Sequence, residues 1–337
     1  MLPYFRNQPL SLFSSPTRDL RALWRIPLYI ALLVVLFTIF NMVLERFPAL
    51  GHSPNSPSTL FAQESAGFAI VALASWILSR IEGCPLGNYG LRLTANFAQE
   101  FFQGCIFGLC EISLLIGVIA AFGGYSFGAL SLGGSAILRW AVTWAVVFLF
   151  VGFFEEFGFR GYILHGLAQL IGFWPAAISL GLVFGYVHSY NPGETWPGEL
   201  GVFCIAVIFA FTLRRTGSLW LAVGWHAAFD FGESFLYSVP DSGAVIPGHL
   251  STAYLHGPTW KTGGSDGPEA SLFSFAVMAL MTAIFHFLYP AKPTPAPRSP
   301  TLPTPALEIQ LDALAALQNH APSPDDPTSP SNSQNSS

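Results

Sequence analysis

Charged residues are scarce in this chain of 337 residues, because Asp, Glu, Lys and Arg together make up only 10% of it. Hydrophobic residues make up 52%, and so little charge cannot cover the surface of a water-soluble protein. The composition therefore argues against a soluble domain and favours a protein solvated by lipid. The formal net charge of −5 says little about partners, since the acids gather in a few loops, near Glu155 and in the tail.

Two kinds of motif are also missing. No basic run with interleaved aromatic residues follows the pattern of a nucleic-acid-binding surface, so we expect no nucleic acid partner. The cysteines show no CxxC spacing, and they indicate neither a disulfide framework nor a thiolate metal site. We expect all four to be small core residues: Cys84, Cys105, Cys110 and Cys204.

The sequence contains several long apolar runs that are candidate membrane spans. A helix needs about 20 apolar residues to cross a bilayer, and the candidate spans are residues 26–44, 60–79, 98–122, 136–172, 173–187, 200–213, 219–237 and 272–289. The first run, residues 26–44, follows an arginine-rich segment, as the apolar part of a secretory signal does. No convincing small-residue cleavage site follows the run, so we expect it to remain as an uncleaved first span. The sequence predicts an all-α fold, a polytopic transmembrane helical bundle of about eight helices.

One candidate span, residues 136–172, is too long for a single straight crossing. At about 1.5 Å per residue it would exceed about 50 Å, whereas the hydrocarbon core measures about 30 Å. We expect it to tilt, protrude or break, with Gly158 and Gly161 as candidate breaks.

The basic residues alternate between the predicted loops, which favours two cytoplasmic termini in an integral protein of the plasma (inner) membrane. We divide the chain into a cytoplasmic segment at 1–25, amino-terminal transmembrane helices at 26–135, a catalytic core at 136–237, an extracytoplasmic loop at 238–271, a last transmembrane helix at 272–289, and a disordered Pro/Ser-rich tail at 290–337.

Ionisable residues inside the spans are costly, so each is a functional candidate, with structural pairing as the competing explanation. In the segment Glu155-Glu156-Phe157-Gly158-Phe159-Arg160-Gly161, Glu156 and Arg160 are four residues apart and share a helix face. Glu155 points about 100° away. It is therefore the carboxylate left free to act as a base, while Glu156 and Arg160 hold each other in position. A purely stabilising Glu/Arg cluster is the alternative.

Two histidines follow in later spans. Glu155 and His188 are nearly equidistant from a turn expected near Ile171 or Gly172, so a helical hairpin would bring both to one water molecule. His226 and Asp230 are four apart on one helix face. Asp230 either accepts a hydrogen bond from His226 and fixes its tautomer, or reaches the same reacting oxygen.

In this order and spacing, the motifs Glu155-Glu156-x-x-Phe159-Arg160-Gly161, Phe184-x-x-x-His188 and His226-x-x-x-Asp230 resemble the CPBP family. That family comprises CAAX-processing endopeptidases of the prenyl protease 2 type and bacteriocin-processing or immunity proteins, including the lysostaphin resistance protein group. The resemblance covers roughly residues 136–237.

The resemblance implies an intramembrane endopeptidase that hydrolyses a peptide bond of a membrane-associated protein or peptide, prenylated in the best-known cases. Glu155 with His188 would activate water, and His226 with residue 230 would stabilise the oxyanion. Many members carry Asn at that last position, and an ionised Asp cannot donate to an oxyanion. Asp230 is therefore either protonated or an orienting partner of His226.

We expect no cofactor. Family members are often called metalloproteases, and zinc, if present, would take Glu155, His188 and His226 as ligands. The chain lacks a His-Glu-x-x-His motif, and a histidine that polarises the oxyanion competes with its use as a ligand.

Three other interpretations stay open. The segment Gly124-x-Ser126-x-Gly128 fits the G-x-S-x-G pattern of serine hydrolases but lies in a predicted loop, without the strand-turn-helix context of that motif. A non-catalytic immunity or scaffold protein and a proton-coupled transporter would also hold buried acids. Glu111 has no assigned role, interfacial or packed roles are expected for His165, His286 and Glu233, and the loop at 238–271 would gate, bind substrate or only connect.

Overall fold

The computed structural model describes residues 16–46 and 56–290, with side chains from residue 24 onward. By its contacts the chain divides into Met1–Lys292 and Pro293–Ser337, and the second unit lies outside the described residues. The first fifteen residues of the predicted cytoplasmic segment and residues 291–337 of the predicted tail also lie outside them.

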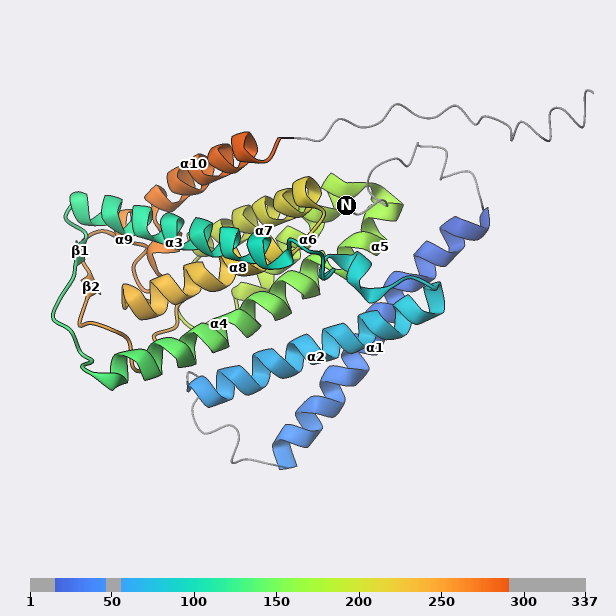
Figure 1. The fold of residues 1–337 in the computed structure, drawn as a ribbon, viewed down its shortest axis with the longest axis horizontal. Helices are drawn as coiled ribbons and strands as arrows, with labels where there is room; N and C mark the ends of the chain where they lie inside the picture. The colour runs from blue at the N-terminus through green and yellow to red at the C-terminus, as the bar shows by residue number, and fades with distance from the viewer. Residues whose placement is uncertain (1–15, 47–55, 291–337) are drawn as a thin grey trace, which may run out of the picture. The chain divides into compact units, whose positions relative to one another are not determined.

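The described residues are almost entirely helical, as the apolar runs predict (Figure 1). The main helices are α1 (Pro16–Arg46), α2 (Pro57–Glu82), α3 (Phe97–Ala121), α4 (Ser135–Arg160), α5 (Tyr162–Ile171), α6 (Phe173–His188), α7 (Trp196–Thr216), α8 (Trp220–Asp230) and α10 (Leu272–Leu288). The shorter elements are η4 (Leu86–Tyr89), the π-helix η5 (Phe231–Leu236), α9 (Thr259–Thr262), η6 (Pro268–Ala270), and the antiparallel strands β1 (Tyr125–Ser126) and β2 (Tyr254–Leu255). The predicted helical bundle is confirmed.

Several of these helices are long and apolar enough to cross a membrane. Five meet that standard: Trp24–Arg46 within α1, α2, α3, the segment Ser135–Ile171, and α7. The shorter helices α6 and α10 are also apolar, and α8 continues without interruption into η5. The sequence underestimates α7, because the predicted span of residues 200–213 is a helix of 21 residues. The protein is therefore an integral membrane protein.

The long segment breaks at Gly161, one of the two predicted positions. Helix α4 ends at Arg160, and Gly161 adopts φ −78° and ψ −121° before α5 begins. A Cβ atom on Gly161 would lie 2.3 Å from the carbonyl oxygen of Phe157, so only glycine fits this bend. The chain then turns at Gly172, where φ is +88°, and α6 runs back toward the level of Glu155.

Helix α8, which carries His226 and Asp230, is held close to α3 by glycines. A Cβ atom on Gly104 or Gly108 would lie 2.1 or 2.2 Å from a backbone carbonyl oxygen of α8, and one on Gly224 would lie 2.1 Å from that of Phe101. Small residues at a helix interface let two membrane helices pack backbone to backbone. On its other side α8 contacts α4, so it lies between α3 and α4 (Figure 1).

Helix α1 is attached to the bundle at one end by a polar cluster. Arg25 pairs with Glu82 of α2 at 3.0 Å. The hydroxyl groups of Tyr89 and Tyr162 both donate to the same carboxylate. Glu82 thereby joins α1, α2, η4 and α5, and this cluster lies outside the cavity described below.

The cysteines do not all follow the prediction. All four thiols are free; Cys84, Cys105 and Cys204 are half-buried, but Cys110 is exposed. The prediction of a core position is therefore wrong for Cys110, because its side of α3 is not covered by another described element.

Candidate active site

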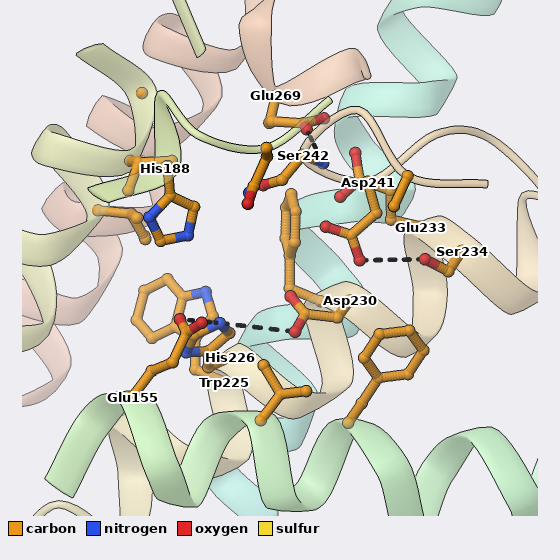
Figure 2. A pocket seen from close by; sticks show the side chains of 18 of the residues that line it. Glu155, His188, Trp225, His226, Asp230, Glu233, Ser234, Asp241, Ser242 and Glu269 are labelled. Carbon is orange, nitrogen blue, oxygen red and sulfur yellow. Dashed lines mark hydrogen bonds and ion pairs between the residues drawn. The ribbon is translucent and has the colours of Figure 1, made fainter. Parts of the chain in front are cut away.

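A cavity of about 340 Å³ opens inside the bundle and collects most of the ionisable residues of the spans (Figure 2). Its apolar walls come mainly from α4, α6, α7 and α8, with contributions from α2, α3, α10 and the loop at 238–271. The ionisable residues that line it are Glu64, Glu111, Glu155, His188, His226, Asp230, Glu233, Asp241 and Glu269. The three motifs of the sequence thus meet in one cavity.

Glu156 lies behind this cavity and connects two of the motifs. Its Oε1 atom lies 3.2 Å from NH1 of Arg160, as the four-residue spacing predicts. The same atom lies 3.0 Å from Nδ1 of His226, and the Glu156 side chain is fully buried. An ionised carboxylate only accepts, so Nδ1 of His226 carries the proton of this hydrogen bond. The sequence predicts the contact with Arg160 but not the contact with His226.

Arg160 also contacts the helix that carries His188. Its guanidinium carbon lies 4.6 Å from the ring centroid of Phe184 on α6, a cation–π geometry. The Phe184 carbonyl oxygen accepts from Nδ1 of His188 at 2.9 Å, and the two rings pack edge to face at 4.5 Å. The Nε2 atom of His188 is left as the acceptor.

The second ring nitrogen of His226 faces two carboxylates. Its Nε2 atom lies 3.6 Å from Oε2 of Glu155 and 3.5 Å from Oδ2 of Asp230. Glu155, whose side chain is 21% exposed, is on the cavity side (Figure 2). The contact of His226 with Asp230 agrees with the predicted shared face. However, Glu156 rather than Asp230 contacts Nδ1 and so fixes the orientation of the ring.

His188 and Glu155 both line the cavity, as the predicted hairpin requires. Among the described residues no direct hydrogen bond or ion pair joins them. Both side chains point into the space between α4 and α6 (Figure 2). This arrangement leaves room for a molecule between the carboxylate and the imidazole.

Several residues that line the cavity are not assigned to it from the sequence. Glu64 of α2 and Glu111 of α3 both line the cavity, and Glu111 accepts from the indole N–H of Trp225 at 2.5 Å. Glu233 is not merely interfacial, because it is 1% exposed and lines the cavity. The helices of Glu64 and Glu111 carry no motif near these residues, so only the tertiary packing reveals their positions.

The loop at 238–271 is more than a connector. Asp241 and Glu269 from this loop form part of the cavity wall. Burial raises the pKa of Asp241 to about 6, and burial also raises the pKa of Glu269 well above its ordinary value. The loop therefore contributes two carboxyl groups that burial inclines toward protonation.

The proposed zinc ligands do not converge in this geometry. A metal site needs at least three His, Cys, Asp or Glu side chains whose ligand atoms lie close together. Within residues 24–46 and 56–290, one group of three has its ligand atoms within 4.8 Å of one another, and it consists of Glu233, Asp241 and Glu269. A tetrahedral zinc ion holds its ligands at about 2.0–2.3 Å. The ligand atoms of Glu155, His188 and His226 are not gathered closely enough to meet this requirement.

The serine hydrolase pattern lies away from the cavity. Ser126 is in strand β1, and its hydroxyl oxygen lies 2.9 Å from Nε2 of His256. Within the described residues no carboxylate contacts His256, and neither residue lines the cavity. Of the remaining histidines, His165 packs against Tyr89 and His286 contacts Arg215, which agrees with the packed or interfacial roles expected for them.

Comparison with known proteins agrees with this geometry. Residues 137–232 match the family model described as type II CAAX prenyl endopeptidase Rce1-like. No curated protein matches the chain. The matched residues include all three motifs and end two residues after Asp230. The region that holds the three motifs is therefore similar to the type II CAAX prenyl endopeptidases, in agreement with the resemblance of these motifs to the CPBP family.

Proposed function

We propose that this protein is an endopeptidase that hydrolyses a peptide bond of a membrane-associated protein or peptide, as CAAX-processing enzymes do. One observation carries the proposal. Glu155 lies on the cavity side of α4, 3.6 Å from Nε2 of His226, while its neighbour Glu156 is occupied by Arg160 and His226. The cavity thus presents the Glu155 carboxylate beside an imidazole that a second carboxylate, Glu156, holds in place, an arrangement that suits water activation.

In the first step, a water molecule between Glu155 and His188 attacks the carbonyl carbon of the substrate. Glu155 takes one proton from the water, and the Nε2 atom of His188 accepts a hydrogen bond from the other O–H. The new C–O bond forms while the carbonyl oxygen takes up negative charge. This role for His188 is supported by the bond of its Nδ1 atom to Phe184, which leaves Nε2 as an acceptor.

His226 and Asp230 are the proposed partners of that oxygen. With both nitrogens protonated, His226 donates from Nδ1 to Glu156 and directs its Nε2–H into the cavity. Asp230 lies 3.5 Å from the same Nε2 atom, and we assign it the protonated state, in which its O–H donates to the oxyanion. An ionised Asp230 would repel the charge that develops there.

In the second step, the C–N bond breaks and the leaving amine takes the proton that Glu155 received from water. The products are a new carboxylic acid, which then releases its proton to water and becomes a carboxylate, and a free amino terminus, and Glu155 is again ionised. Glu156 and Arg160 act as positioning residues, because they touch His226 and Phe184 rather than the reacting atoms. No metal or organic cofactor enters these steps.

The walls of the cavity indicate the kind of substrate. Apolar side chains from α4 and α7, among them Val147, Val151, Ile205 and Phe209, suit an apolar segment or a lipid group beside the scissile bond. A prenylated carboxy-terminal tail, held in the bilayer by its lipid, is therefore the first substrate to test. We place the enzyme in the plasma (inner) membrane with both termini cytoplasmic.

The test is cleavage of a reporter peptide by the purified full chain in phosphatidylcholine nanodiscs. A peptide with a prenylated cysteine near its carboxyl end is compared with the same peptide without the lipid, and products are identified by mass spectrometry. We expect loss of the residues that follow the cysteine, faster for the prenylated peptide, and no effect of the zinc chelator 1,10-phenanthroline. Activity that chelation abolishes and zinc restores would contradict the metal-free mechanism. Folded protein that cleaves neither these peptides nor a transmembrane reporter would contradict the proposed function.

A further inference from the structure

A second group of acidic side chains lies at the far end of the cavity from Glu155 (Figure 2). Glu233, Asp241 and Glu269 each present a carboxylate oxygen, and these three oxygens lie within 4.8 Å of one another. The residues come from separate parts of the chain, since Glu233 belongs to η5, Asp241 follows it in the loop and Glu269 lies in η6. The proposed hydrolysis uses none of them.

Glu233 gives an independent indication of a ligand. Its side chain is 1% exposed, and no N–H or O–H group of the described residues donates to its Oε1 atom. The Glu269 carboxyl is within hydrogen-bond reach, but two carboxyl groups bond to each other only when one of them holds a proton. The side chain points toward Asp241 and Glu269 (Figure 2). A buried carboxylate oxygen without a donor is costly, and this cost falls when a proton or a cation binds it.

The two loop carboxylates, Asp241 and Glu269, each accept one hydrogen bond from a neighbouring group. Ser234 donates from its hydroxyl to Oδ2 of Asp241 at 3.0 Å, and the backbone N–H of Ser242 donates to Oε1 of Glu269 at 2.6 Å. No N–H or O–H group within the described residues donates to the Oε2 atom of Glu269. These bonds fix the orientation of both carboxylates while they leave acceptor capacity toward Glu233.

Within the described part of the chain, no ion pair balances the charge of this cluster. Among residues 24–46 and 56–290, the ion pairs involve Glu82, Glu155, Glu156 and Asp230, but none of the three clustered acids. Three carboxyl groups so close together cannot all be ionised without a positive partner. The positive charge must come from bound protons or from a ligand.

We infer that Glu233, Asp241 and Glu269 bind a hard divalent cation, with Ca²⁺ as the preferred ion. The donors are oxygen atoms only, which is the ligand set of Ca²⁺ and Mg²⁺ rather than of zinc or copper. Ca²⁺ holds its ligands at about 2.3–2.6 Å in a flexible geometry, so two ligands of one ion lie up to about 5 Å apart, and these oxygens fall within that limit. Mg²⁺ demands a tighter octahedron.

The bound ion would stabilise the wall of the cavity by linking two parts of the chain. Glu233 lies three residues after Asp230 on a continuous helix, whereas Asp241 and Glu269 belong to the loop at 238–271. A cation shared by these side chains would tie the loop to the helix that carries His226 and Asp230. This role goes beyond the proposed hydrolysis and is independent of it, because it predicts binding and stability whatever the substrate is.

The test measures Ca²⁺ binding directly. The full chain is treated with EGTA, transferred to phosphatidylcholine nanodiscs without anionic lipid, and titrated with CaCl₂ by calorimetry against empty nanodiscs. We expect one site with a Kd on the order of 10⁻⁴–10⁻³ M, as for Ca²⁺ sites with few protein ligands. The midpoint of thermal unfolding should rise as Ca²⁺ exceeds the Kd, because the ion binds the folded state.

Variants locate the site. The double variant Asp241→Asn and Glu269→Gln should lose the binding heat and the thermal shift, whereas Glu111→Gln, a buried carboxylate of the same cavity outside the cluster, should keep both. Without Ca²⁺ the double variant should unfold no earlier than the wild type, because the amides remove like-charge repulsion. Absence of binding by the wild type up to about 10 mM would overturn the inference. Undiminished binding by the double variant would also overturn it.

Discussion

The Nδ1 atom of His226 lies 3.0 Å from Oε1 of Glu156, and this contact joins α8 to α4 beside the cavity. Glu156 also pairs with Arg160 at 3.2 Å. One buried carboxylate thus holds a histidine and an arginine at once, and the Nε2 atom of His226 is directed toward Glu155 and Asp230. The orientation of the imidazole is set by Glu156 rather than by the residue four positions away on its own helix.

The substitution Glu156→Gln tests this positioning role. The amide removes the charge that both Arg160 and His226 contact, so the imidazole should lose its fixed orientation and protonation. We expect kcat to fall about 10–100-fold with KM little changed. A pH profile of kcat shifted toward lower pH would show that the protonated form of His226 has lost support.

The control for this measurement is Glu199→Gln, which alters a carboxylate of α7 that does not line the cavity. Its kcat and pH profile should match the wild type. If Glu156→Gln also matches the wild type, the contact with His226 has no part in catalysis.

The role of Asp230 is tested by two substitutions of similar size. If Asp230 donates to the oxyanion as a neutral acid, Asp230→Asn keeps a donor and should retain activity within about tenfold. Asp230→Leu removes the donor and should lower kcat about 10²–10³-fold. Equal losses in both variants would instead favour an ionised Asp230 that orients His226. Thermal unfolding of both variants checks that the fold is retained.

Close packing of α3 on α8 predicts different effects for two glycines of the same helix. In Gly108→Ala the new Cβ would lie 2.2 Å from the carbonyl oxygen of Trp225, so α3 must move away from α8. We expect a loss of about 1–3 kcal/mol in unfolding free energy. Gly117→Ala has no atom within 4 Å of its new Cβ and should leave stability unchanged. Equal unfolding midpoints for the two variants in detergent would contradict the proposed close approach.

The loop before α7 makes stability depend on pH. Burial, and then the charges of Asp266 and Glu199, raise the pKa of Glu194 from its ordinary value of 4.5 to about 8. The folded state therefore binds the proton more tightly than the unfolded state. This contribution to stability is complete below pH 4.5 and is lost as the pH rises through 8. Glu194→Gln should unfold at a higher temperature than the wild type at pH 9 and at the same temperature at pH 4, and a constant difference would contradict this origin.

Much of the fold and part of the site follow from the sequence. The apolar runs predict the helices, and the bend at Gly161 follows from a segment too long to cross the bilayer straight. The proximity of Glu156 to Arg160 and of His226 to Asp230 follows from the 3.6-residue turn, since both pairs lie four residues apart. Local periodicity is sufficient for contacts within one helix.

Contacts between helices are harder to predict. Glu64 and Glu111 lie on helices without a motif, so nothing local indicates that α2 and α3 turn them toward the cavity. Asp241 and Glu269 belong to a loop rich in Gly, Ser and Pro, where acids are usually solvated. The pairing of Glu156 with His226 spans 70 residues and depends on the close approach of α8 to α4.

The most direct test of the central claim, that Glu155 activates the attacking water, is the single-turnover rate of reporter cleavage by Glu155→Gln. Glutamine keeps the size of the side chain but cannot accept the proton, so we predict a fall of about 10³-fold or more with unchanged peptide binding. Glu45→Gln, at an exposed position near the end of α1, should cleave like the wild type. Cleavage by Glu155→Gln within about tenfold of the wild-type rate would contradict the role of Glu155 as the base.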